Sequence, residues 1–427
     1  MRSAAARVDA LVSVYAQILA NPGLLKLELM MRGIRVPDAV RDRLNGGFGV
    51  TGHALFGSAG DVDLVLPGGT WVSVPVTDGR MAPTPYALDC VDDAFTIRVD
   101  EDASATCRVE VRRPSDFFTR TTSTGIPYGR IGTVHGPYLA LSPSNRCTFL
   151  TDADRCRFCG VGQDGATHGG VPVDDVLEAI RIARADNPID MVYLSVGHLG
   201  TSDGGVRFLE PYVAAIKKHF DILVAVDALP PEDDGWIDRT YAMGVDAVSY
   251  NLEIFDAERF ERVCPGPARE VGRARFLDAL AYAATVFPSG GVTCHLIVGL
   301  EPLESTRAGI TALTEMGVLP VLPIYRPFKG RDMRRDADIE LFPPTLDELI
   351  ALHTHLYSAV RARKLSLNLV RDIAIVTTPL EGRFFANDDS VWTSLQVRVM
   401  GSRVGRRTST VLSDLRRHLR VRRIEQS

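Results

Sequence analysis

The sequence of 427 residues lacks a long hydrophobic run, because no uninterrupted apolar stretch approaches the roughly 18 residues that span a bilayer. It also lacks a strong charge bias: 48 Lys and Arg stand against 53 Asp and Glu, a net charge of −5. That balance gives no general attraction to nucleic acid or to anionic lipid. Internal repeats and low-complexity segments do not stand out. We therefore expect a soluble protein with neither a nucleic-acid partner nor a membrane anchor.

The N-terminus shows no secretory pattern. Its most apolar stretch, 11–20, follows Arg7 and Asp9 and contains Gln17, which predicts an amphipathic first helix. Cysteines are few, and their odd number of seven fits a reduced compartment better than a disulfide framework. A cytoplasmic protein is therefore expected. With 45% hydrophobic and 24% charged residues, the chain should form two or three globular domains, or one large α/β barrel with an added piece.

Residues 1–125 differ in pattern from the rest of the chain. Helical periodicity to about Met30 gives way to short alternating stretches bounded by Gly, Pro or Asp, at 61–66, 70–76 and 94–99. This pattern predicts an N-terminal α+β accessory domain. Cys90 and Cys107 are isolated within it, and such cysteines are more often core residues than ligands.

From about Tyr138, short apolar runs alternate with helical patterns, which is typical of parallel βαβ units. Six strands are predicted, at 138–143, 191–197, 222–227, 247–252, 292–299 and 319–325. We therefore expect an α/β fold, with a partial (β/α)6 TIM-like barrel over 126–343. Ligands in such barrels lie at the carboxyl ends of the strands.

Residues 344–427 are predicted to form a helical C-terminal extension with a basic tail. Eight Arg fall within 401–427, and Leu412, Leu415 and Leu419 recur at helical spacing. We expect an amphipathic helix docked on the acidic body, or a solvated end. Binding to nucleic acid or to a membrane is the alternative.

Three of the cysteines, Cys147, Cys156 and Cys159, follow the first barrel strand with the spacing Cys-x8-Cys-x2-Cys. Iron and zinc both favour thiolate ligands, and the x2 spacing lets two cysteines bind one ion or cluster from a tight turn. A structural zinc site normally has four protein ligands, as does a cluster that only transfers electrons. Three cysteines therefore indicate a [4Fe–4S] cluster with one open position, where a small molecule binds.

This motif, with Phe158 directly before the third cysteine, resembles that of the radical SAM superfamily. In that superfamily three cysteines hold a [4Fe–4S] cluster, and S-adenosylmethionine (SAM) binds the fourth iron. The resemblance, which covers about 120–365, implies that a flavodoxin or ferredoxin-type reductant delivers an electron through the cluster. SAM would then be cleaved to a 5′-deoxyadenosyl radical that removes hydrogen from a small-molecule substrate. The first gap departs from the commonest pattern, which has three residues instead of eight.

A nearer resemblance lies in the x8 gap and in three short phrases. These are Thr124-Gly125-Ile126-Pro127-Tyr128, Met243-Gly244-Val245-Asp246 and Arg326-Pro327. Together they resemble a bacterial radical SAM family that is encoded beside a nitrilase, and this implies the cofactors but no substrate. Extra cysteines are expected near the C-terminus of that family, whereas none follows Cys294 here. An auxiliary cluster is therefore not expected.

The superfamily resemblance also suggests residues that contact SAM. Asn251 and Glu253 end the fourth strand and resemble the stretch with which biotin-synthase-like enzymes hold the ribose. Strand alternation puts both on one side; the alternative is a polar strand end that caps the next helix. Gly299 and Glu301 lie in a segment that resembles the one facing the adenine, where glycine permits a close backbone approach.

Ser195 and Gly197 follow the second strand, where the superfamily binds the amino group of SAM, although the usual Gly-Gly-Glu is absent. Arg326, directly after the sixth strand, is a candidate to bind a carboxylate of SAM or of the substrate; a surface ion pair is the alternative. The positions that face the substrate show no familiar pattern.

Four further residues have a weaker signal. His168 and His198 are predicted to be loop histidines, and Cys294 is predicted to be a core residue. Cys264 lies in a loop near the barrel mouth, and we keep it as a thiol to test for a radical or auxiliary role.

Two alternatives to radical chemistry remain. Zinc bound by the three cysteines and His168 would make the chain a non-radical barrel that serves as a binding module. An aldolase-like barrel with coincidental cysteines would need a lysine for a Schiff base, and none occurs on the candidate strands.

Overall fold

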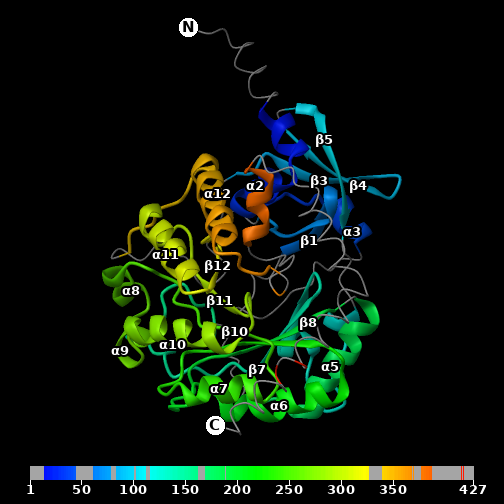
Figure 1. The fold of residues 1–427 in the computed structure, drawn as a ribbon. Coiled ribbons are helices and arrows are strands. Elements are labelled where there is room, and N and C mark those ends of the chain that lie inside the picture. The colour runs from blue at the N-terminus through cyan, green and yellow to red at the C-terminus, as the bar shows by residue number, and fades with distance from the viewer. Residues whose placement is uncertain are drawn as a thin grey trace.

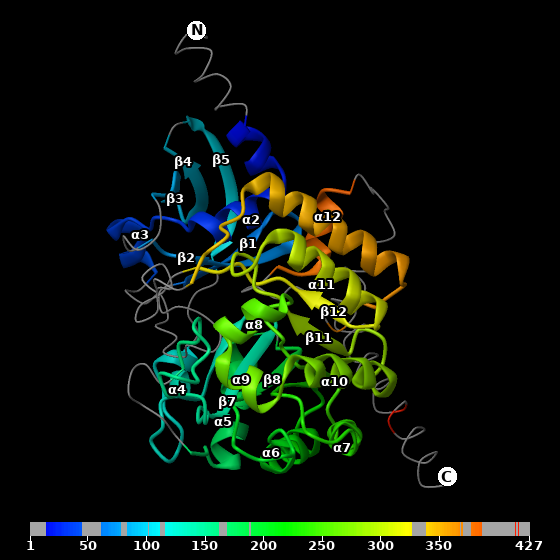
Figure 2. The ribbon, with the colours of Figure 1, turned by 90° about the vertical axis from the view of Figure 1, so that its left-hand side faces the viewer.

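The computed structural model describes residues 14–44, 61–77, 83–100, 102–111, 116–161, 169–187, 189–326, 339–367, 369, 377–386, 415 and 417. These residues form two sheets with their helices. Figures 1 and 2 show the smaller, N-terminal sheet above the larger one in both views.

The N-terminal sheet is antiparallel throughout, with the order β2-β1-β5-β4-β3. Its strands are β1 (Asp61–Leu66), β2 (Thr70–Pro75), β3 (Tyr86–Val91), β4 (Ala94–Val99) and β5 (Asp102–Val111). The helices around it are α2 (Pro22–Arg32), α3 (Asp38–Arg43) and η1 (Pro67–Gly69), whereas η2 (Asp116–Phe118) places Phe117 in the core of the larger sheet. The three strands predicted here are confirmed, and β2 ends one residue earlier than predicted. The Asn21 side chain caps α2 by accepting from the N–H of Gly23 at 2.9 Å.

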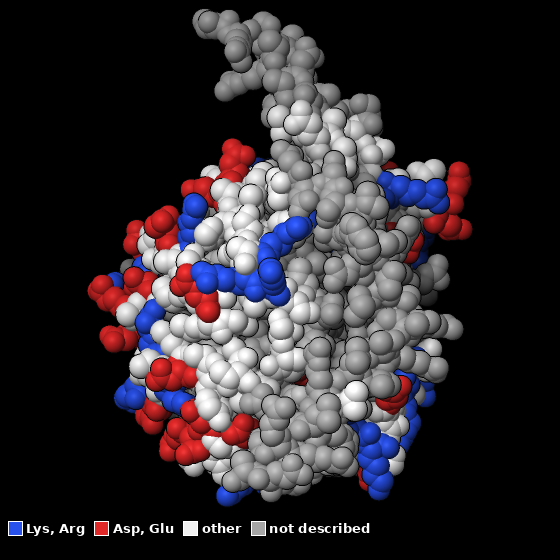
Figure 3. All heavy atoms as spheres, in the orientation of Figure 1, with Lys and Arg blue, Asp and Glu red and all other residues white. Residues whose placement is uncertain are grey.

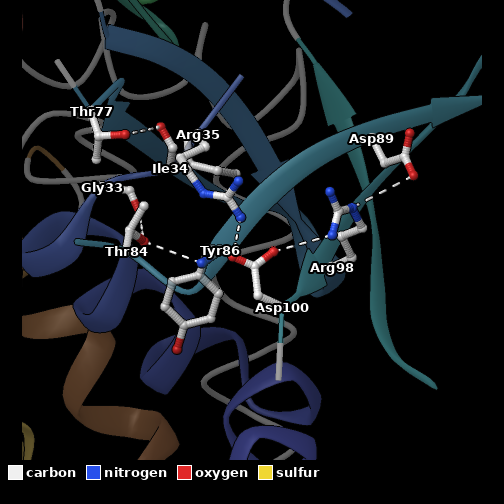
Figure 4. A network of polar contacts seen from close by, with 9 residues as sticks. All are labelled: Gly33, Ile34, Arg35, Thr77, Thr84, Tyr86, Asp89, Arg98 and Asp100. Atoms are coloured by element: carbon white, nitrogen blue, oxygen red, sulfur yellow. Dashed lines mark hydrogen bonds and ion pairs between the residues drawn. The ribbon is translucent and has the colours of Figure 1, made fainter. Parts of the chain in front are cut away.

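Polar contacts hold the segment after α2 against this sheet, as Figure 4 shows. Arg35 pairs with Asp100, which also accepts a hydrogen bond from Arg98 at 3.2 Å. The Thr84 hydroxyl donates to the carbonyl of Gly33 at 2.9 Å. Because the Arg35 and Asp100 side chains are 42% and 41% exposed, their ion pair adds little stability and mainly fixes the register of the segment.

Asp63 on β1 is an acid in an apolar setting. Burial raises the pKa of Asp63 to about 7, and the hydrogen bond from Ser73, 2.5 Å long, offsets part of that rise. The negative charge of Asp61, on the same face two residues earlier, raises it further.

We expect Asp63→Asn to change how stability depends on pH. Because the pKa of Asp63 is higher in the folded chain than the ordinary value of about 4, the folded state binds more protons between about pH 4 and pH 7. The free energy of unfolding of the wild type therefore falls as pH rises through that window. Asp63→Asn should gain about 1–3 kcal/mol over the wild type at pH 8 and little at pH 4. Urea unfolding at both pH values measures this, with the exposed Asp278→Asn as control; an equal difference at both would contradict the expectation.

The larger sheet has the order β12-β11-β10-β9-β8-β7-β6. Its strands are β6 (Gly132–His135), β7 (Tyr138–Ser144), β8 (Met191–Val196), β9 (Leu223–Asp227), β10 (Ala247–Ser249), β11 (Val292–His295) and β12 (Leu319–Val321). Strands β7 to β12 are parallel and follow chain order, so the six predicted strands and the partial (β/α)6 barrel are confirmed. The edge strand β6, antiparallel to β7, was not predicted.

The helices of the barrel connect its strands. They are α4 (Tyr128–Ile131), α5 (Val173–Asp186), α6 (Val206–His219), α7 (Gly235–Ala242), α8 (Ala257–Val263), α9 (Pro265–Glu270), α10 (Arg273–Val286) and α11 (Leu303–Glu315). The short helices α8 and α9 were not predicted. Strands β10 to β12 end before the predicted 252, 299 and 325, and beyond their ends isolated parallel bridges, Glu253 with Leu296 and Val298 with Ile324, continue the pairing.

The C-terminal part begins with α12 (Leu346–Ala362), capped by a reciprocal pair of hydrogen bonds between Thr345 and Glu348, and ends in η4 (Pro379–Phe384). Helix α2 packs against α12 and η4, so the N-terminal part of the chain is in contact with the segment that follows the barrel. Most of the predicted basic tail lies outside the described residues. Within them, Arg417 donates to the carbonyl of Tyr241 at 3.0 Å and to Asp246 at 2.7 Å.

The surface in Figure 3 mixes both charges, with acidic side chains gathered along the edge that carries α8 and α11. This mixture agrees with the small net charge. Among the described residues, none of the helices combines the length and the apolar character needed to cross a bilayer.

Candidate active site

The loop after β7 carries three free thiols, those of Cys147, Cys156 and Cys159, each half-buried. Burial raises the pKa of Cys159 to about 12, and the neighbouring Cys156 and Cys147 raise it further. The three sulfurs are thus close enough to influence one another. Soft thiols gathered on one loop form the donor set that iron–sulfur clusters use.

Arg155 lies in this loop and binds its backbone carbonyls. Its guanidinium donates to the carbonyls of Val161 at 2.8 Å and of Leu150 at 3.4 Å. The N–H of Cys159 donates to the carbonyl of Cys156 at 3.0 Å, which closes the tight turn expected of the x2 spacing. Hydrogen bonds within the loop therefore fix its backbone conformation around the three thiols.

The loop also rests on α8 and α9. The N–H of Arg157 donates to the carbonyl of Val263 at 2.8 Å, and the N–H of Gly266 donates to that of Asp154 at 3.0 Å. Asp154 also pairs with Arg269 at 2.5 Å. A Cβ atom on Gly266 would lie 2.5 Å from the Asp154 carbonyl oxygen, so only glycine allows this approach. The helices that sequence reasoning missed therefore position the thiol loop.

Gly197 and His198, after β8, support the loop from its other side. A Cβ atom on Gly197 would lie 2.6 Å from the Arg146 carbonyl oxygen and 2.7 Å from Cys147 Cβ. The His198 ring stacks on Phe149, with centroids 4.5 Å apart, and its Nδ1 lies 2.6 Å from the Thr148 hydroxyl. His198 thus has its polar contact within the chain, as predicted for a loop histidine. Phe158 is half-buried and packs against the barrel core.

Among the described residues, no three His, Cys, Asp or Glu side chains form a group that could hold a single metal ion. His168, the fourth ligand of the zinc alternative, lies outside them. Cys264, at the junction of α8 and α9, is buried beside the thiol loop. A hydrogen bond with Cys264, and then burial, raises the pKa of Cys156 well above its ordinary value. Cys294 lies in the core, as predicted.

A polar cluster lies at the carboxyl ends of β8, β9 and β10. Ser195, Asp227 and Ser249 are level with one another in the sheet. The Ser195 hydroxyl donates to Asp227 Oδ2 at 3.0 Å, and Asn251 Nδ2 donates to Asp227 Oδ1 at 2.9 Å. The Asn251 amide oxygen accepts from the Ser249 hydroxyl at 2.6 Å and from the His295 N–H at 3.0 Å. The orientation of the Asn251 amide is therefore fixed by the chain.

This cluster faces the barrel interior. On β9, Leu223 and Ala225 alternate with residues that pack toward the helices, and they join Met191 in a small apolar group. Asp227 continues the same alternation and so lies on the interior side. Sequence reasoning missed Asp227, although it ends a predicted strand, at the position where barrel ligands bind.

Glu253 lies beside this cluster in an unusual backbone conformation. Its φ of 67° is left-handed, which non-glycine residues adopt mostly under local constraint and often at functional sites. Burial raises the pKa of Glu253 to about 8, and the charge of Asp227 raises it further. Its Oε2 atom is buried without a hydrogen-bond partner among the described residues. An acceptor is therefore free on the interior side.

Two more side chains of the same region were not predicted. Burial raises the pKa of Tyr193, two residues before Ser195, and the charge of Asp227 contributes. Burial lowers the pKa of His295 to about 4, so its ring is neutral near pH 7. The only signal in the sequence is the period of two along a strand. It puts Tyr193 on the same face of β8 as Met191 and Ser195, and His295 on the same face of β11 as Thr293.

Glu301 and Arg326 are not part of this cluster. Both oxygens of Glu301 are engaged: Oε2 accepts from the N–H groups of Phe255 and Asp256 at 2.9 and 2.8 Å, and Oε1 accepts from Thr306 at 3.1 Å. These contacts tie the start of α8 to α11, and a contact of Glu301 with SAM stays a prediction. Arg326 pairs with Asp61 at 2.6 Å.

Comparison with known proteins identifies the domain. Residues 141–304 match the radical SAM superfamily. Bacteriochlorophyllide c C-7(1)-hydroxylase from Chlorobaculum limnaeum is 27% identical over 131 residues, 30% of this chain and 31% of that protein. The chain thus spans about a third of that relative's length.

Two solved structures match part of the chain. HydG, a maturase of the [FeFe]-hydrogenase, matches with a TM-score of 0.44 and 15% identity over 54% of this chain and 51% of that one. Methylornithine synthase (PylB) matches with a TM-score of 0.42 and 15% identity over 62% and 82%.

Radical SAM proteins use a [4Fe–4S] cluster and SAM, and the matched residues 141–304 include all three cysteines of the loop together with β8 to β11. The prediction made from the cysteine motif is confirmed at the level of the superfamily; the nearer resemblance, to the family encoded beside a nitrilase, stays a prediction. The chain carries a radical SAM superfamily domain.

Proposed function

We propose that this chain is a radical SAM enzyme that acts on a small-molecule substrate. The observation that carries the proposal is the set of three free thiols, Cys147, Cys156 and Cys159, on one loop at the carboxyl end of β7. Three thiolates leave one iron of a [4Fe–4S] cluster for SAM. When bound, the cluster and SAM supply reductive cleavage of SAM to methionine and a 5′-deoxyadenosyl radical, which takes hydrogen from the substrate.

The chain supplies the placement of these groups. Gly197 on one side and Gly266 on the other have no side chain, so the thiol loop packs closely between β8 and α9. Arg155 fixes the loop carbonyls. A loop held from three directions keeps its thiols in position with little reorganisation when metal binds.

Asn251 and Glu253 are proposed to contact the ribose of SAM. The unpartnered Oε2 of Glu253 is an acceptor that suits a ribose hydroxyl, as carboxylates do in dinucleotide sites. Asp227 acts as a positioning residue, because it holds the Asn251 amide at 2.9 Å while Ser195 holds Asp227 at 3.0 Å. Gly299, with its φ of 102°, is proposed to let the backbone approach the adenine.

The reaction also needs an electron. We propose that a flavodoxin or ferredoxin-type protein is the reductant. We also propose that this chain divides into three domains, with boundaries at residues 125 and 343. Membership of the family encoded beside a nitrilase belongs to the same proposal and rests on the x8 gap and the three phrases that resemble that family.

Anaerobic reconstitution with iron and sulfide, followed by SAM and dithionite, tests the proposal. We expect a brown protein that forms 5′-deoxyadenosine. A colourless protein that retains zinc under the same treatment would instead support the zinc alternative.

At pH 9, where a group with a pKa of about 8 is charged, replacing Glu253 with glutamine should weaken SAM binding by about tenfold or more, because a hydrogen bond to a charged group contributes about 1.5–3 kcal/mol. Equilibrium dialysis of radiolabelled SAM against the reconstituted protein measures this. Glu258→Gln on α8, whose side chain is 79% exposed, is the matched control and should bind SAM like the wild type. Unchanged SAM affinity in Glu253→Gln would remove Glu253 from the site.

A further inference from the structure

A fourth thiol lies next to the thiol loop, and the proposed function does not use it. Cys264 is the residue between α8 and α9, and it is only 1% exposed. Cys156 is half-buried, so it is the more accessible of the two. The two side chains form a hydrogen bond with each other. The fold therefore pairs a buried thiol with one of the three thiols that would hold the cluster.

Backbone hydrogen bonds on both sides of this pair fix its register. The N–H of Arg157 donates to the carbonyl of Val263 at 2.8 Å, and the N–H of Gly266 donates to the carbonyl of Asp154 at 3.0 Å. Because residue numbers rise along one segment as they fall along the other, the two segments are antiparallel. Counting one residue inward from the first bond sets the two cysteines opposite each other. Their contact thus follows from the backbone as well as from the side chains.

This arrangement has the geometry that a disulfide needs. Opposed residues of antiparallel backbones have Cα atoms about 4.5–5.5 Å apart. A disulfide joins residues whose Cα atoms are about 4.4–6.8 Å apart. The glycine at 266 keeps the two backbones close, since a Cβ atom there would lie 2.5 Å from the Asp154 carbonyl oxygen. A bond between the two sulfurs therefore needs little movement of either segment.

We propose that Cys156 and Cys264 form a reversible disulfide when the loop holds no cluster. Disulfides of proteins in reducing compartments are usually transient and redox-sensing, and this pair is of that kind. The disulfide protects Cys156 from irreversible oxidation to a sulfinic or sulfonic acid. It also blocks cluster assembly; this second part rests on the proposed function, because a [4Fe–4S] cluster without Cys156 keeps only two protein ligands.

Glutathione disulfide is the oxidant for this step. The accessible Cys156 thiolate attacks one of its sulfurs, which releases one glutathione and leaves the other bound to Cys156 as a mixed disulfide. The Cys264 thiolate then attacks the Cys156 sulfur and releases the second glutathione. Two electrons pass from the two cysteines to the oxidant, and the two thiol protons end on the two glutathione molecules. An excess of dithiothreitol reverses both steps.

A peptide map of the metal-free, full-length protein tests the proposal. The protein is incubated anaerobically with glutathione disulfide, and the remaining thiols are then alkylated with N-ethylmaleimide. Trypsin separates the thiols, because arginines at 155, 157, 262 and 269 place Cys156 in the peptide 156–157 and Cys264 in the peptide 263–269. We expect mass spectrometry to find these two peptides joined in most of the chains, and separate after dithiothreitol.

Cys264→Ser isolates the second step of the reaction. It should stop at the mixed disulfide, so that the peptide 156–157 carries glutathione and no cross-link forms. Cys90→Ala, which removes a half-buried thiol of the N-terminal sheet, is the matched control and should cross-link like the wild type. Alkylation of both thiols in the oxidised wild type, or a disulfide between Cys156 and Cys159, would overturn the proposal. If Cys264→Ser does not fold, the wild-type map decides alone.

The proposal can fail separately from the proposed function. The cross-link is measured on metal-free protein, whereas iron uptake and 5′-deoxyadenosine formation are measured after reconstitution. Oxidised wild type should take up several-fold less iron than reduced protein, and dithiothreitol should restore the uptake. Normal iron uptake by cross-linked protein would overturn the block on assembly. A protein that cross-links, but cleaves no SAM after reduction and reconstitution, would keep the disulfide and lose the proposed function.

Discussion

Alanine in place of any one of Cys147, Cys156 and Cys159 is expected to reduce the iron content of the anaerobically reconstituted protein from about four atoms per chain to well under one. The reason is the small number of ligands. With three thiolates and one exchangeable position, the loss of one thiolate leaves two iron corners without a protein ligand. Iron and sulfide analysis, together with the absorbance of the thiolate-to-iron bands, measures the loss. Formation of 5′-deoxyadenosine should disappear with it.

The matched control is Cys90→Ala. Cys90 is a free, half-buried thiol on β3 of the N-terminal sheet, so its removal should leave iron content and SAM cleavage unchanged. Wild-type iron in Cys147→Ala, Cys156→Ala and Cys159→Ala alike would show that the loop does not hold the cluster. A separate Cys264→Ala variant tests whether the Cys264 thiol, which lies beside Cys156, takes part in binding the cluster.

Replacing Lys26 with methionine is expected to lower the free energy of unfolding by about 3–5 kcal/mol, because it leaves a buried carboxylate without its partner. Lys26 on α2 pairs with Glu381 in η4, and their side chains are 1% and 4% exposed. Glu381 also accepts from the Thr378 hydroxyl at 2.8 Å. The positive charge of Lys26 opposes the effect of burial and holds the pKa of Glu381 below its usual value. The pair joins the N-terminal part of the chain to the C-terminal part.

Urea unfolding followed by far-UV circular dichroism measures this cost. The double variant Lys26→Met, Glu381→Leu should recover most of the loss, because an apolar pair can replace a buried ion pair at little cost. Arg262→Gln breaks the exposed pair with Glu258 and should cost less than about 0.5 kcal/mol. A loss below about 1 kcal/mol in Lys26→Met would show that water reaches Glu381.

The barrel could be predicted from sequence because its signal is local. Each of the six strands is a short apolar run next to a helical pattern, and the cysteine motif lies directly after the first run. Helices α8 and α9 could not be predicted in this way, because they are only seven and six residues long and Cys264 separates them. β6 has only four residues, and its pairing with β7 reverses the direction expected from the βαβ pattern.

The site residues also divide into those that a local motif reveals and those that only long-range contacts place. The thiols and Asn251 are readable because they form motifs within a few residues. Asp227 becomes interpretable only when the register places it level with Ser195 and Ser249, which requires three strands at once. The contact of Arg326 with Asp61 spans 265 positions, and no local pattern reports it. Glu301 shows the opposite case, a motif-like residue whose oxygens are already used within the fold.

The docking of the thiol loop on α9 has a consequence for protein engineering. Asp154, which contacts Gly266 and Arg269, belongs to the eight residues between the first two cysteines. A chimera that received the shorter three-residue gap would delete this docking point while keeping the helix built to receive it. Gap length and α9 therefore form a single exchangeable module, and grafting either one alone should leave the recipient with an unanchored metal-binding loop.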